Sequence, residues 1–84
     1  MRLLMQQRPD GREAPRFVQL QLQPDLLGGW TLLRESGQIG GRSTLKRELY
    51  TDQASALAAL ESARDAQLKR GFQLMFAHGA DAPR

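Results

Sequence analysis

Fifteen residues between Gly28 and Arg42 constrain the fold more than any other part of the chain. They hold the only Trp and five of the eight glycines. Glycine adopts backbone conformations with φ > 0 and lets another segment approach closely, so this cluster predicts a sharp bend. The stretch therefore predicts a strand, a Gly-rich corner and the start of a second strand. The residues expected to build the corner are Trp30, Gly37, Gly40 and Gly41.

Alternation of apolar and polar residues predicts the strands of a half-buried antiparallel sheet. Val18, Leu20 and Leu22 share one face of the clearest example, while glutamines occupy the other face. Further along the chain, Arg47 falls on the same face as two leucines, which predicts either a bulge or a face that is only half covered. The expected strands span 2–7, 17–23, 30–35, 43–51 and 72–76.

An Ala-rich segment over 52–70 has the period of an amphipathic helix, and Thr51 is expected to be its N-cap. Pro-Asp-Gly marks a loop over 8–15, and the small residues over 77–84 predict a tail. The sequence thus predicts one domain over 1–84 with an α+β fold. A small antiparallel sheet of four to five strands carries one helix, in the order β-β-β-β-α-β.

The composition argues against catalysis. The chain of 84 residues has no Cys and one His, and its nine Asp and Glu residues show no pair suited to acid–base work. We expect no enzyme activity, no cofactor, no metal and no small-molecule substrate, and we expect His78 to be an exposed residue of the tail. No apolar run is long enough for a signal peptide or a membrane span, so we expect no membrane partner and a cytoplasmic location.

The corner and its flanks resemble the WGR domain, a small module of some poly(ADP-ribose) polymerases and of free-standing bacterial proteins. The likeness rests on Trp-x-Leu-Leu-Arg from Trp30, on x-Gly-x-Ile-Gly after it, and on the helix closed by Gly71-Phe72. It covers roughly residues 17–72 and implies the same sheet-and-helix architecture. The aromatic face and the positive charge of the family's signature are missing, because its Trp-Gly-Arg is replaced here by Ser36-Gly37-Gln38.

In the polymerases such domains are associated with DNA-end sensing and with contacts to neighbouring domains. The resemblance therefore implies a non-catalytic module that binds DNA or other nucleic acid through a basic surface around the corner. A net charge of +3 is a mild bias in the same direction. With the signature pair replaced, we expect this binding to be weak or lost. The candidate nucleic-acid-binding residues are Arg34, Gln38, Arg42, Lys46 and Arg47.

Each of these signals also has a purely structural interpretation. The cations can form an ordinary solvated face with Glu35 and Glu48 as partners. The glycines can form a phosphate-binding nest or a tight turn, and Trp30 can stack on a base or, as we favour, pack on the sheet. A second class of function is a protein-interaction or self-association module. In that hypothesis the sheet edge over 72–76, or the apolar groups near the corner, bind a protein partner or a second copy.

Overall fold

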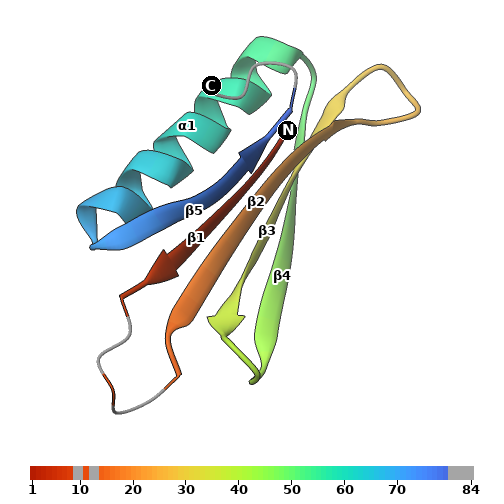
Figure 1. Ribbon diagram of the computed structural model, residues 1–84. Helices are drawn as coiled ribbons and strands as arrows, with labels where there is room; N and C mark the ends of the chain where they lie inside the picture. Colours follow the sequence, from red (N-terminus) through yellow and green to blue (C-terminus); the bar gives the residue numbers. More distant parts are fainter. Residues whose placement is uncertain (9–10, 12–13, 80–84) are drawn as a thin grey trace.

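The computed structural model describes residues 1–8, 11 and 14–79 of the chain. Its elements follow one another in the predicted order β-β-β-β-α-β (Figure 1). The α+β fold with one antiparallel sheet and one helix is confirmed. The elements are β1 (Arg2–Gln7), β2 (Arg16–Pro24), β3 (Trp30–Gln38), β4 (Ser43–Tyr50), α1 (Gln53–Lys69) and β5 (Phe72–His78).

The five strands form a single sheet with the spatial order β4-β3-β2-β1-β5. β1 to β4 make a meander in which each strand pairs antiparallel with the next one. β5 returns after the helix and pairs with β1, so that β4 and β5 are the two edges of the sheet. α1 lies along one side of the sheet (Figure 1). We call the opposite side, which α1 does not cover, the uncovered face.

The hydrophobic core fills the space between α1 and the sheet. The predicted apolar face of β2 is buried, and Leu20 at its centre is fully enclosed. α1 contributes Leu60 and two small residues, Ala56 and Ala63, whose size lets the helix approach the strands closely. The core residues are Leu3, Met5, Val18, Leu20, Leu22, Leu32, Ala56, Leu60, Ala63 and Phe72.

The ends of α1 follow from capping contacts. Asp52 is the N-cap, and its Oδ1 accepts a hydrogen bond from the Ser55 backbone N–H at 2.7 Å, so the prediction of Thr51 at this position is wrong. A carboxylate at a helix N-terminus also interacts favourably with the helix dipole. At the other end Gly71 has a φ of 91° and its N–H donates to the Leu68 carbonyl, as a glycine after a helix does.

Among the described residues, no helix has the length and apolar character needed to cross a membrane.

Three strands are longer than the sequence predicts, and β2 gains one residue at each end, Arg16 and Pro24. β3 continues to Gln38 because Gly37 pairs with residues of both β2 and β4, which shortens the corner to a turn. β5 continues to His78 because Ala77 and His78 pair with Leu3 and Arg2 of β1. The prediction of a tail from residue 77 is therefore wrong, and residues 80–84 lie outside the described residues. Residues 9–10 and 12–13 of the predicted loop over 8–15 also lie outside the described residues. The described residues of that loop lie between β1 and β2.

The uncovered face explains the unusual position of Arg47. Pairing between β3 and β4 is regular from Trp30 opposite Tyr50 to Gly37 opposite Ser43, so β4 contains no bulge. Arg47 alternates away from the core and lies with the leucines of β4 on the uncovered face. Of the two alternatives that the sequence left open, the half-covered face is confirmed. The register shift of the sheet occurs elsewhere, between β1 and β5.

Candidate nucleic-acid interface

The Gly-rich corner is a tight turn between β3 and β4. The Gly41 N–H donates to the Gln38 carbonyl at 2.8 Å, and Gly40 has a φ of 78°, which glycine adopts without steric cost. Gly37 lies on β3 before the turn, where a Cβ would come within 2.7 Å of the Ser43 Cα. Chain geometry therefore accounts for Gly37 and Gly40. Trp30, at the far end of β3, packs against the core.

Polar groups of the corner are engaged within the chain. The Gln38 N–H donates to the Arg42 carbonyl at 3.3 Å, and the Ile39 N–H donates to the Pro15 carbonyl at 3.0 Å. The Gln38 side chain donates from Nε2 to the Ala14 carbonyl at 2.9 Å, so the turn is fastened to the segment before β2. An anion-binding nest requires consecutive N–H groups that point toward the ligand. The corner is accordingly a structural turn, with Arg42 exposed at its end.

The predicted binding residues of β3 and β4 do not share one surface. Arg34 is paired with both Leu20 and Lys46, so Arg34 and Lys46 lie on the side of the sheet that faces α1. Arg47 is paired with Leu33 and lies on the uncovered face. The sequence neighbours Lys46 and Arg47 therefore point to opposite sides of the sheet, and only Arg34 and Lys46 form a common cationic surface.

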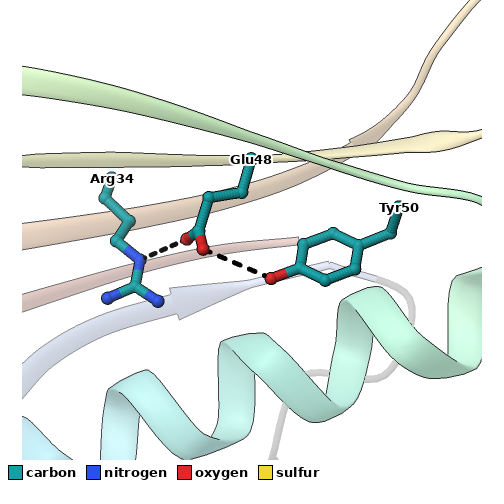
Figure 2. Close-up of polar contacts among 3 residues, drawn as sticks. All are labelled: Arg34, Glu48 and Tyr50. Carbon is teal, nitrogen blue, oxygen red and sulfur yellow. Dashed lines mark hydrogen bonds and ion pairs between the residues drawn. The ribbon is translucent and has the colours of Figure 1, made fainter.

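Arg34 is held by a carboxylate on the neighbouring strand. Its Nε donates to Glu48 Oε1 at 2.6 Å, and the Tyr50 hydroxyl donates to Glu48 Oε2 at 3.4 Å (Figure 2). Desolvation, and then the negative charge of Glu48, raise the pKa of Tyr50 above its ordinary value, while the charge of Arg34 opposes that rise. Glu48 therefore fixes the Arg34 guanidinium and balances part of its charge, whereas Lys46 is exposed beside it.

Two adjoining hollows lie between the C-terminal half of α1 and the strands. The first, of about 140 Å³, includes Arg34 and Lys46; the second, of about 330 Å³, includes Arg16 and Arg70. Both hollows include Ser36, and no Asp or Glu is among the described residues that line either of them. We call this surface the basic trough. Its polar residues are Gln7, Arg16, Arg34, Ser36, Thr44, Lys46, Gln67 and Arg70.

Sequence reasoning missed two of the four cations in the trough. Arg16 begins β2, and Arg70 is the C-cap of α1, so both lie far along the chain from Arg34. The signal for Arg16 was present in the sequence, because a meander places the start of one strand beside the end of the next. In the structure Arg16 is directly opposite Gln38. Arg70 had no such signal, because its position depends on how the helix crosses the sheet.

The chemistry of the trough suits an anion. Guanidinium, ammonium and amide groups donate hydrogen bonds, and the hydroxyls of Ser36 and Thr44 can donate as well. The first hollow is smaller than the enclosed pockets that bury small ligands, and the second is at the lower limit of their size. Within the part of the chain that the structure describes, no group of three His, Cys, Asp or Glu residues forms a potential metal site. The arrangement favours contacts to phosphate oxygens of a larger ligand.

Comparisons of the chain with protein-family models, curated proteins and solved structures found no match. The resemblance to the WGR domain therefore stays a prediction. It rests on the motifs of residues 17–72 and on the position of Ser36-Gly37-Gln38 within them.

Proposed function

We propose that this domain is a non-catalytic module that binds nucleic acid in the cytoplasm through the basic trough. The observation that supports the proposal is the meeting of four cations from separate elements, with no carboxylate among the residues that line the two hollows. Arg16 comes from β2, Arg34 from β3, Lys46 from β4 and Arg70 from the end of α1. The sequence predicted a binding surface at the corner. The surface that we propose lies instead on the side of the sheet that faces α1.

The trough is suited to the phosphate backbone rather than to base edges. Flexible Lys and Arg side chains at its rim can follow phosphates, while Ser36 and Thr44 add hydroxyl contacts. The hollow that includes Arg34 and Lys46 is lined by aliphatic and polar residues, whereas Phe17 and Phe72 line the second hollow. We infer binding that depends strongly on salt and weakly on sequence.

Membership of the WGR family forms part of this proposal. Residues 36 and 38, which replace the signature Trp and Arg, belong to the face of β3 that carries Arg34, and Ser36 lines both hollows. A ligand in the trough would touch the place of the family signature, and this position supports the same general function. The missing Trp removes an aromatic surface from this place, which is consistent with phosphate contacts of modest affinity.

Two neighbouring residues of β4 provide the test. Lys46→Glu and Arg47→Glu change the net charge equally, but Lys46 belongs to the trough and Arg47 to the uncovered face. Fluorescence anisotropy with a labelled DNA duplex at low ionic strength should show a clear loss of affinity for Lys46→Glu and a much smaller one for Arg47→Glu.

Equal losses for the two variants would mean that the duplex responds to net charge alone and would contradict a binding site in the trough. Absence of wild-type binding at low salt would contradict nucleic-acid binding itself. Thermal unfolding of both variants serves as the control for folding. Both side chains are exposed, so both variants should retain the stability of the wild type.

A further inference from the structure

β4 is an edge strand with the properties of a pairing surface. It is regular over Ser43–Tyr50, contains no Pro or Gly, and has no strand beyond it among the described residues. Most of its residues are exposed, including Leu45 at 61% and Leu49 at 71%. Natural proteins protect such an edge with charged side chains, a bulge, a proline or a covering segment, because its free backbone groups can pair with another strand. Of these devices β4 has the charges of Lys46, Arg47 and Glu48.

The backbone of β4 presents its free groups at alternate residues. The Gln38 N–H donates to the Arg42 carbonyl, and hydrogen-bonded pairs then recur at every second residue of an antiparallel ladder. The even-numbered residues of β4 consequently bond to β3. The N–H and C=O groups of Leu45, Arg47 and Leu49 point outward, away from the sheet.

The other edge is less suited to pairing. The sequence predicted that the edge over 72–76 or the apolar groups near the corner would bind another chain. In the structure β5 is interrupted, because Leu4 pairs with Phe76 while the next residue, Met5, pairs with Leu74. This shift leaves Met75 as an extra residue, and a bulge twists a strand and disturbs its edge. β4 has no such irregularity.

We propose that two copies of this chain associate through antiparallel pairing of β4 with β4, around a two-fold axis at Arg47. A two-fold axis perpendicular to the sheet keeps the α1 side of both copies on the same side. In this register Lys46 lies opposite Glu48 of the second copy, and the same pair occurs twice. Leu45 lies opposite Leu49 of the second copy, so the exposed leucines of the two uncovered faces meet. Opposite charges and apolar groups in directly paired positions stabilise a sheet.

Charge disfavours the two registers in which a residue next to Arg47 lies on the axis. A shift that places Lys46 on the axis sets two ammonium groups against each other and pairs Leu45 with Arg47. A shift that places Glu48 on the axis sets two carboxylates against each other. With Arg47 on the axis, one like-charged pair remains, and its long side chains can separate on the uncovered face.

Packing of the two uncovered faces against each other is less favourable than edge pairing. This face carries Gln19, Gln21 and Gln23 of β2 together with Glu35 of β3. A sheet-to-sheet core would bury these polar side chains, which costs free energy unless each one finds a hydrogen-bond partner. Edge pairing leaves them in water.

Sedimentation equilibrium over a range of protein concentrations tests the association. We expect a concentration-dependent dimer of the wild type, and at least a roughly tenfold higher dissociation constant for the double variant Leu45→Lys/Leu49→Lys. Met75→Lys places the same charge on an exposed apolar residue of the opposite edge and should leave the dissociation constant unchanged. A wild-type monomer at every concentration, or dissociation caused by Met75→Lys instead, would overturn the proposal.

Single cysteines test the register, because the chain has no Cys of its own. Only a residue on the axis lies opposite itself, so Arg47→Cys should form a disulfide-linked dimer under mild oxidation. Leu45→Cys and Leu49→Cys should each link poorly alone and efficiently when the two variants are mixed, since paired strands bring their Cα atoms within disulfide range. Efficient linkage of Leu45→Cys to itself would contradict this register. These outcomes are independent of DNA binding, because neither leucine lines the trough.

Discussion

Replacing Lys46 by Gln should flatten the salt dependence of DNA binding by a calculable amount. Arg34 shares its charge with Glu48 at 2.6 Å, so in the proposed complex Arg16, Lys46 and Arg70 would be the main phosphate ligands. Each neutralised phosphate contributes about 0.9 to the slope of log K against log salt, which gives a wild-type slope near −2.7. Affinity should then fall about 40-fold when salt rises from about 50 to about 200 mM.

Removal of one contact changes this slope to about −1.8, so Lys46→Gln should lose affinity only about 12-fold over the same range of salt. Arg47→Gln is the matched control, because it removes the same charge from the uncovered face and should keep the wild-type slope. Fluorescence anisotropy titrations of a labelled duplex at four or more salt concentrations provide both slopes. Equal slopes for the two variants would refute the assignment of Lys46 to the binding surface.

The remaining predictions concern stability and ionisation. Leu20→Ala removes a fully buried side chain from the centre of the sheet and should cost about 3 to 5 kcal/mol in chemical denaturation. Gly37→Ala places a Cβ against the β4 backbone and should cost about 1 to 3 kcal/mol, whereas Gly41→Ala should change stability by under about 0.5 kcal/mol. The pKa of Tyr50 is raised in the folded state, so the stability contributed by its protonated hydroxyl is complete below the ordinary pKa of 10.0. That stability is lost as pH rises through the higher pKa of the folded state. Ultraviolet titration of this single tyrosine should give a midpoint above 10.0, which Glu48→Gln lowers.

Local sequence patterns were sufficient to predict the fold, because β1, β2 and α1 each bury one apolar face. The buried and exposed residues of β2 alternate as the sequence predicts, and one stripe of α1 meets them. The errors are at the ends of elements, where long-range pairing decides. β5 extends through Ala77 because β1 provides a partner for it, and no property of residues 77–78 themselves contains that information.

The proposed binding surface was harder to predict than the fold. The sequence grouped Lys46 and Arg47 because they are adjacent, but the period of a strand places neighbouring side chains on opposite faces. Applying that period strictly would have separated them. The convergence of Arg16 and Arg70 depends instead on strand register and on the crossing of α1 over the sheet, which one sequence without a structure does not define. Local patterning therefore predicts faces, whereas tertiary packing decides which faces meet.

The pairing of β3 with β2 and β4 constrains which residues fit at positions 36 to 38. Gly37 is required by the backbone, because no Cβ fits beside Ser43. Ser36 lines the trough, whereas the Gln38 side chain donates to the Ala14 carbonyl. Arg16 is directly opposite Gln38, so an arginine at position 38 would place two like charges in one cross-strand pair, which is destabilising.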